Sequence, residues 1–335
     1  MISLVQLGTV DYATGLRLQQ QLVALRKEEK IGDVLLLLEH SPVITLGRNA
    51  KAANIIAPAE LLAQRGVELF ETDRGGDVTF HGPGQIVGYP IFDLRGFDRG
   101  EADCLVRPGE QTSTVRKHLG AVDFVRRLEE VLIRTCADFA IPTKRVPGLT
   151  GVWTDTNCLS FRADENDSEN RSLESRNPLC PNEEETTAAN SRFLDCKGRS
   201  VAGSSFFARN DNNGGRQHGV DAGEAKLAAI GIHISRFVTS HGFALNVNTD
   251  LSYFNLIIPC GITAKPVTSM QKELSKELDL NTVAESISRN IGTVFSSQML
   301  WVETLDALLG HAVGVPLRLP AELRLLHEED DSAWA

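Results

Sequence analysis

A long polar stretch divides this chain and constrains how it can fold. Between residues 156 and 222 the sequence is rich in Asn, Asp, Glu, Ser and Gly, for example over 164–170 and 210–215. Such a composition buries too little apolar surface to offset the entropy lost on ordering. We therefore interpret 156–222 as a polar insertion or flexible surface loop, in which only 201–207 is expected to fold locally. The core must come from the segments on either side.

Composition and charge exclude several classes of protein. Of the 335 residues, 42% are hydrophobic, enough for a sizeable core, and the formal net charge is −10. That charge argues against a broad basic face that binds nucleic acid. No apolar run approaches the ~18 residues of a membrane span, and the first residues lack the features of an export signal. The six cysteines do not resemble a disulfide framework, so we expect a soluble, cytoplasmic protein without a nucleic-acid or membrane partner.

The periodicity of apolar residues predicts an α/β chain. Helical spacing predicts helices over 11–30, 58–65, 121–139, 281–298 and 301–309. Strands are predicted over 34–38, 43–46, 67–72, 78–81, 86–92, 226–235 and 238–247. The continuous apolar run at 34–38 is typical of a strand buried on both faces, and the last two strands are expected to pair. The tail from residue 316 is expected to be peripheral.

A glycine-rich segment at residues 74–85 is the first candidate for a binding site. Its glycines allow the backbone to approach a ligand closely, and Arg74 and His81 supply polar groups. The same composition also suits a tight β-hairpin with a solvent-facing arginine. The segment is neither the dinucleotide-binding pattern nor a phosphate-binding loop, since both lead from glycines into a helix with other spacings.

Three further residues have both a chemical and a structural interpretation. His241, in a strand of alternating small and apolar residues, is either a base or a core histidine. Lys226 opens a strand of small residues and is either a functional amine or an exposed strand end. Cys260 lies between Pro259 and Gly261 on a constrained turn. A thiol there can face a pocket, but it is mostly protonated at pH 7 and needs a nearby cation or base to act as a nucleophile.

The remaining cysteines favour a structural role. A small buried hydrophobe is the alternative for Cys260, and it describes Cys136, which falls on the apolar stripe of the helix predicted over 121–139. The other four cysteines are expected in loops, and no Cys-x-x-Cys pair is present to suggest a zinc site.

Together these segments resemble the lipoyl(octanoyl) transferases, the octanoyltransferase family of lipoate biosynthesis. The matching motifs lie at 74–89, 226–231, 241–246 and 259–261, in the family's order. The resemblance covers roughly 1–155 and 224–298 and implies the fold of biotin and lipoate protein ligases, an α/β (α+β) fold with a mixed curved β-sheet and flanking helices. It implies one catalytic domain, 1–298, interrupted by the insertion 156–222 and followed by a peripheral C-terminal extension, 299–335.

The resemblance also implies an acyltransferase. Cys260 would accept an octanoyl group from octanoyl-acyl carrier protein as a thioester and pass it to a lysine of a lipoyl domain, in 2-oxoacid dehydrogenases or the glycine cleavage H protein. Lys226 is the implied partner of the thiol. As an ammonium it would lower the thiol pKa by ~1–3 units, and as a neutral amine it would act as a base; both alternatives stay open. The implied substrate contacts are Arg74, Gly75, Gly76, Asp77, Val78, Thr79, Phe80, His81, Ala229, Ile230, Gly231, Gly242, Phe243 and Ala244.

Such a reaction implies no cofactor and no metal, and we expect a monomer. Thioester exchange is nearly balanced in energy and aminolysis of a thioester runs downhill, so no nucleotide is needed. Burying roughly seven chain carbons at ~0.8 kcal/mol each would contribute about 5–6 kcal/mol, and small residues on 226–231 and 241–246 leave room for the chain. Two alternatives remain: an amidotransferase that moves lipoyl or octanoyl groups between carrier proteins, and an inactive homologue that only binds carrier proteins. An ATP-dependent ligase is disfavoured because it gains nothing from a nucleophilic thiol.

Overall fold

The computed structural model describes residues 1–97, 118–155, 224–259, 265–305 and 307–309. The chain divides into two units, Met1–Leu159 with Gly219–Ala335, and Ser160–His218. All described residues belong to the first unit. The predictions for the polar insertion, including 201–207, and for the tail from residue 316 therefore lie outside the described residues.

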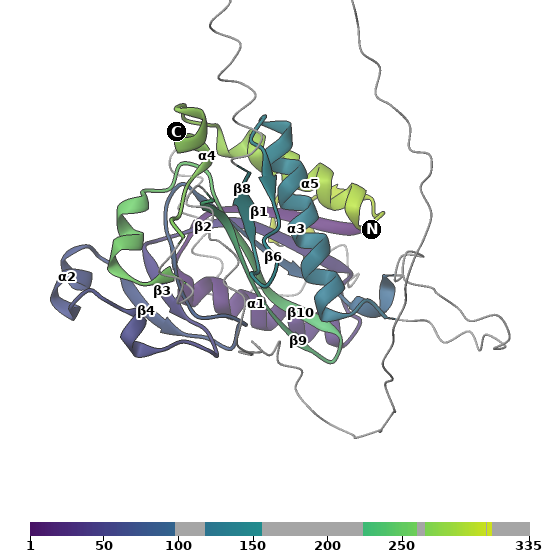
Figure 1. Ribbon diagram of the computed structural model, residues 1–335. Coiled ribbons are helices and arrows are strands. Elements are labelled where there is room, and N and C mark those ends of the chain that lie inside the picture. The colour runs from purple at the N-terminus through teal and green to yellow at the C-terminus, as the bar shows by residue number, and fades with distance from the viewer. Residues whose placement is uncertain (98–117, 156–223, 260–264, 306, 310–335) are drawn as a thin grey trace, which may run out of the picture. The chain divides into compact units, whose positions relative to one another are not determined.

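A mixed sheet organises the described part of the chain (Figure 1). Its eight strands follow the spatial order β11 (Met299–Trp301), β1 (Ile2–Val10), β2 (Asp33–His40), β6 (Gln85–Ile91), β10 (Val238–Asn246), β9 (Lys226–Ser235), β8 (Val152–Thr154) and β7 (Thr143–Lys144). Strand β1 runs parallel to both β11 and β2, whereas the other pairs are antiparallel. The predicted pairing of 226–235 with 238–247 is confirmed by β9 and β10.

A smaller sheet carries the glycine-rich segment. It consists of β4 (Glu68–Glu71), β3 (Val43–Leu46) and β5 (Val78–His81) in that order, with helix α2 (Ala59–Gln64) preceding β4. The hairpin interpretation of residues 74–85 is wrong, because β5 pairs with β3 whereas β6 pairs with β2 and β10. The turn between them therefore joins two sheets. Gly84 has φ +77°, and its N–H donates to Glu39 Oε2 at 2.6 Å.

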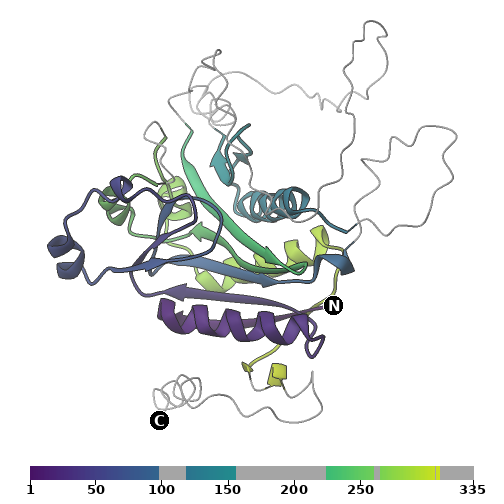
Figure 2. The ribbon, with the colours of Figure 1, turned by 90° about the horizontal axis from the view of Figure 1, so that it is seen from below.

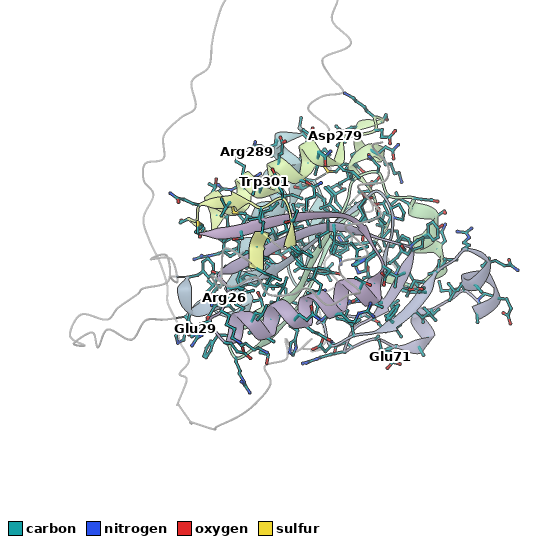
Figure 3. The ribbon with its side chains drawn as sticks, turned by 180° about the vertical axis from the view of Figure 1, so that it is seen from behind. Arg26, Glu29, Glu71, Asp279, Arg289 and Trp301 are labelled. Carbon is teal, nitrogen blue, oxygen red and sulfur yellow. The ribbon has the colours of Figure 1, made fainter. Side chains whose placement is uncertain are left out.

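Helices cover both faces of the large sheet, as Figure 2 shows. Helix α1 (Tyr12–Lys27) lies on one face, and α3 (Ala121–Asp138) and α5 (Leu280–Val294) lie on the other. The short helix α4 (Met270–Leu274) precedes α5. The side chain of Asp11 caps α1 and that of Asp279 caps α5, so backbone N–H groups of both first turns find acceptors. Figure 3 labels Asp279, which immediately precedes α5, and Arg289 on α5.

Strand β2 is the centre of the core. Leu35 and Leu37 pack on the side of α3 and α5, while Leu36 and Leu38 pack on the side of α1. The expectation of a strand buried on both faces is confirmed, and each such side chain contributes about 1.5–3 kcal/mol through burial. Cys136 is fully buried in the same core, and burial raises its pKa to about 12, as expected of a structural cysteine.

The C-terminal part of the described chain differs from the sequence prediction. Helix α5 ends at Val294, and Trp301, expected in a helix, lies in β11; residues 305 and 307–309 are helical. Leu305, Leu308 and Leu309 are buried against the core on the α1 side. Strand β11 therefore extends the large sheet and these three leucines add to its core, whereas the domain boundary at residue 298 stays a prediction. None of the helices in the described part of the chain is both long and apolar enough to cross a membrane.

Candidate active site

A pocket opens on the α1 face of the sheet where β9 and β10 carry small residues. Gly231 pairs with Gly242, and Ala229 pairs with Ala244, so four small residues lie together on this face. The cavity has a volume of only about 50 Å³, so it is a small, partly open pocket in the side-chain arrangement of this structure. The absence of large side chains from this part of the sheet leaves the space that the pocket occupies.

Most of the predicted substrate contacts line this one pocket. They are Arg74, Gly75, Gly76, Asp77, Thr79, His81, Ala229, Ile230, Gly231, Gly242, Phe243 and Ala244. Val78 and Phe80 do not line it, because alternate residues of a strand face opposite sides and these two pack into the core of the small sheet. Tyr12, Val87 and Tyr89 also line the pocket. Tyr12 falls in the helix predicted over 11–30, and Val87 and Tyr89 fall in the motif at 74–89, but none of the three was among the predicted substrate contacts.

Arg74 fixes the backbone that forms one wall of the pocket. Its side chain is buried, and Nη2 donates to the carbonyl oxygens of Thr45 and Asp77, both at 2.7 Å. Its Nε donates to Thr45 Oγ1 at 3.1 Å. The neighbouring Gly75 N–H donates to Ile232 O of β9 at 3.0 Å. The arginine therefore holds the glycine-rich segment on β3, and that segment in turn contacts the large sheet.

Two buried histidines add polar groups without adding charge. His81 Nδ1 lies 2.7 Å from Gln85 Oε1, and burial lowers the pKa of His81 to about 3. Behind the pocket, His40 Nδ1 donates to Val10 O at 2.7 Å, and His40 Nε2 accepts from the Tyr89 hydroxyl at 2.6 Å. Burial lowers the pKa of His40 to about 4. Both rings are therefore neutral at pH 7.

His241 reaches the pocket through an unusual backbone conformation. Its φ of +56° interrupts the alternation of β10, and the imidazole lines the pocket together with Gly242. The backbone N–H of His241 donates to Gln19 Oε1 at 2.8 Å, and its Nε2 donates to Asp73 Oδ1 at 2.7 Å. That hydrogen bond is the main cause that lowers the pKa of Asp73 to about 2. His241 is therefore a buried histidine paired with a carboxylate, and it also lines the pocket.

A second pocket adjoins the first and contains Lys226. Thr79, Ala229 and Ala244 line both pockets, so the two pockets are neighbours that share these three residues. The other residues of the second pocket are Gln85, Lys226, Ala228, Asn246, Phe254, Pro259 and Val267. Lys226 is only 8% exposed, so the interpretation as an exposed strand end is wrong. Cys260, which follows Pro259 in the chain, lies outside the described residues.

Comparison with known proteins identifies the family. Residues 11–292 match the model of the lipoyl protein ligase A/B catalytic domain. A protein of Koribacter versatilis named octanoyltransferase is 48% identical over 330 residues, which cover 98% of each chain. An octanoyltransferase of Acidobacterium capsulatum is 44% identical over 311 residues, 92% of this chain and 96% of that one. The chain belongs to the lipoyl protein ligase A/B catalytic domain family. Within it, the chain groups with the octanoyltransferases, which are enzymes of the transferase class.

Solved structures confirm the fold class. A bipartite lipoate protein ligase from Thermoplasma acidophilum superposes with a TM-score of 0.53 at 10% identity, covering 96% of this chain and 99% of that one. A lipoate-protein ligase A bound with ATP gives a TM-score of 0.51, also at 10% identity, over 98% of this chain and 94% of the other. At this identity the likeness concerns the fold alone, and it confirms the predicted mixed α/β fold of the lipoate ligases.

Proposed function

We propose that this chain transfers an octanoyl group from octanoyl-acyl carrier protein to a lysine of a lipoyl domain, through a thioester on Cys260. The observation that carries the proposal is that Lys226 lines a pocket next to the small-residue pocket, with which it shares Thr79, Ala229 and Ala244. Pro259, the residue before Cys260, lines the same pocket as Lys226. Since consecutive Cα atoms are about 3.8 Å apart, this supports a thiol within reach of the Lys226 amine.

The two half-reactions balance without a cofactor. In the first, the Cys260 thiolate attacks the carbonyl carbon of the donor thioester and a new C–S bond forms. The bond between that carbon and the carrier's sulfur breaks, and the carrier leaves as a thiol with the proton that Cys260 gave up. In the second, the neutral amine of the acceptor lysine attacks the Cys260 thioester. An amide bond forms, the C–S bond breaks, and the proton released by the amine returns to the sulfur. Lys226 would stabilise the thiolate as an ammonium or take the proton as a neutral amine.

The first pocket suits the acyl chain. Its floor is made of Ala229, Gly231, Gly242 and Ala244, and aromatic side chains of Tyr12 and Tyr89 also line it. Burying roughly seven chain carbons there would contribute about 5–6 kcal/mol before ordering costs are subtracted. The donors that we assign to the developing oxyanion of the thioester are backbone N–H groups of the glycine-rich segment other than those of Gly75 and Gly84, which donate to Ile232 O and Glu39 Oε2.

The proposal extends to the partners. The donor is octanoyl-acyl carrier protein, and the acceptors are lipoyl domains of 2-oxoacid dehydrogenases and the glycine cleavage H protein. We propose that the enzyme acts as a monomer in the cytoplasm. The polar insertion 156–222 is proposed to be dispensable for the reaction.

Intact-mass analysis after incubation with octanoyl-acyl carrier protein tests the proposal. The unaltered chain should gain the mass of one octanoyl group, and Cys260→Ala should gain none. Cys136→Ala is the matched control, because it removes a thiol buried in the core and should leave the adduct in place. An adduct of equal yield on Cys260→Ala would eliminate the nucleophile.

The choice of acyl donor distinguishes our proposal from two alternatives, an amidotransferase and an inactive protein that only binds carrier proteins. If the enzyme is an amidotransferase, an octanoylated lipoyl domain should load Cys260 and octanoyl-acyl carrier protein should not. If the chain only binds carrier proteins, neither donor should produce an adduct, although the carrier would still bind. Our proposal requires loading by the carrier protein, followed by loss of the adduct when a lipoyl domain is added.

A further inference from the structure

We propose that Trp153 is a positioning residue that holds the Lys226 ammonium in the second pocket of the candidate active site through a cation–π interaction. The inference rests on the proposed function, because the Trp153 ring has this role only if Lys226 acts on the Cys260 thiol. It concerns the described residues around Lys226 and adds a residue that none of the sequence motifs includes.

The first support is the geometry of the two side chains. Lys226 Nζ lies 5.3 Å from the centroid of the Trp153 ring, within the ~6 Å over which such pairs attract. Trp153 is 1% exposed, so the ring meets the ammonium away from bulk water, where the attraction is strongest. The two residues are register partners in adjacent strands, Trp153 in β8 and Lys226 in β9.

The second support is that the backbone of Lys226 is fixed on its other side. Its N–H donates to Pro266 O at 2.8 Å, and its carbonyl accepts from Thr268 N–H at 2.9 Å. With the main chain held from both sides, the position of Nζ depends on the side-chain torsions. The contact with Trp153 restricts those torsions.

A second lysine near the ring has a different role. Lys265 Nζ also lies 5.3 Å from the Trp153 centroid, but it forms an ion pair with Glu224. Glu224 Oε1 in turn lies 2.8 Å from Lys144 Nζ. The positive charge of Lys265 is therefore balanced by a carboxylate, and its position depends on that ion pair as well as on the ring.

Gly151 makes the contact between ring and ammonium possible. A Cβ atom at this position would lie 2.9 Å from Lys226 Cε and 2.5 Å from Ala228 O, and the φ of +121° suits glycine. The N–H of Gly151 donates to Glu129 Oε1 at 3.1 Å, and Glu129 is fully buried and paired with Arg126 at 2.6 Å. The backbone two residues before Trp153 is therefore held by a buried carboxylate of α3, and the ring itself is buried.

Fluorinated tryptophan tests the proposal without changing the shape of the ring. Fluorine withdraws electron density from the ring face and weakens cation–π attraction stepwise. The chain has three tryptophans, so the background is Trp301→Phe with Trp334→Phe, which leaves Trp153 alone to carry the label. Trp301 lies on the edge strand β11 (Figure 3) and lines neither pocket.

The readout is the pH dependence of Cys260 alkylation by iodoacetamide, followed on the peptide that contains Cys260. Each added fluorine should move the midpoint to higher pH, and the most fluorinated ring should slow alkylation at pH 7 by about three- to tenfold. The thermal midpoint should stay unchanged. Trp153→Phe, which keeps a π face, should retain more reactivity than Trp153→Leu.

Lys226→Ala separates the two proposals. If Lys226→Ala leaves the alkylation profile unchanged, Lys226 does not ionise the thiol and that part of the proposed function fails. If Lys226→Ala shifts the profile but fluorination does not, the proposed function survives and the role of Trp153 is overturned. If both shift it, fluorination should have no further effect in the Lys226→Ala background, and an additional shift there would also contradict the positioning role.

Discussion

His241 and Asp73 form a hydrogen bond in which Nε2 of a buried imidazole lies 2.7 Å from Oδ1 of a carboxylate that is 57% exposed. The bond joins β10 to the segment that precedes the glycine-rich loop. It is the main reason that the pKa of Asp73 falls from the usual 3.8 to about 2. A carboxylate with a depressed pKa stabilises the folded state above the pKa of the unfolded chain, and this stabilisation is lost as pH falls through about 2.

We therefore expect Asp73→Asn to be less stable than the unaltered chain between about pH 5 and pH 7, with the difference shrinking as pH approaches about 2. Urea unfolding across that pH range measures it. Because Asp73 is more than half exposed, solvent screening keeps the effect small. A difference that is the same at every pH would contradict the pairing.

His40 gives a pH dependence in a different range. Burial lowers its pKa to about 4, whereas the same group in the unfolded chain titrates near 6.5. Between these values the unfolded chain binds a proton that the folded chain does not. The free energy of unfolding should therefore fall as pH drops from about 6.5 to about 4, by roughly 3 kcal/mol from this residue.

His40→Gln should reduce that slope, since an amide can still donate to Val10 O and accept from Tyr89 but does not titrate. His81 keeps its own contribution, so part of the slope should remain. The control is His118→Gln, which removes an exposed histidine and should leave the slope as it was. Equal slopes in His40→Gln and the unaltered chain would show that His40 is not buried in the neutral form.

The size of Ala229 should determine which acyl chains fit. Ala229 lines both pockets and pairs with Ala244, so a leucine there would occupy the space between them. We expect Ala229→Leu to lower the rate of octanoyl loading at least about tenfold, equivalent to about 1.4 kcal/mol, and to spare butyryl loading. Competition between octanoyl and butyryl donors, measured by intact mass, gives the ratio of the two loading rates. Ala63→Leu, on the exposed side of α2, should leave it unchanged.

An alanine at Gly151 should lower the free energy of unfolding more than an alanine at Gly8, although both glycines have a positive φ. Gly8 has φ +62° with nothing within 4 Å of an added Cβ, so Gly8→Ala should cost only the backbone strain, about 1 kcal/mol. Gly151→Ala adds the clash with Ala228 O and Lys226 Cε, and we expect it to cost about 1–3 kcal/mol more. Urea unfolding compares the two. Gly151→Ala should also slow octanoyl loading, whereas Gly8→Ala should not; equal behaviour would contradict the crowding at Gly151.

Much of the secondary structure was predictable, because the spacing of apolar residues over a long segment distinguishes a helix from a strand. Helix α1, the buried strand β2 and the β9–β10 pair all agree with the patterns in the sequence. Strand β11 was not predicted, since three apolar residues are too few to show a period and their role depends on a distant partner, β1. The separation of β5 from β6 was also not predictable, because glycine and proline mark a turn without saying which sheet each strand joins.

The pocket residues that belong to sequence motifs could be predicted. Those that reach the pocket only through the packing of distant segments could not. The glycine-rich segment and the small residues of β9 and β10 lie around one pocket. Tyr12 and Trp153 carry no motif, and their neighbours in space are far away in the chain. The hydrogen bonds of Arg74 to the carbonyl groups of Thr45 and Asp77 depend on the small sheet, which the segment's own sequence does not specify.

Several contacts hold β8 and β9 together where β8 ends and β9 begins. Thr154 N–H donates to Ala225 O at 2.9 Å, and Lys144 Nζ bridges Asp155 at 3.2 Å and Glu224 at 2.8 Å. Because these contacts join the two strands directly, the pairing of β8 with β9 depends little on the segment that connects them. Each doubling of the connector's length adds only about 0.6 kcal/mol of closure cost. The length of the connector between residues 155 and 224 can therefore change at little cost to the pairing of β8 with β9, and so to the position of Lys226.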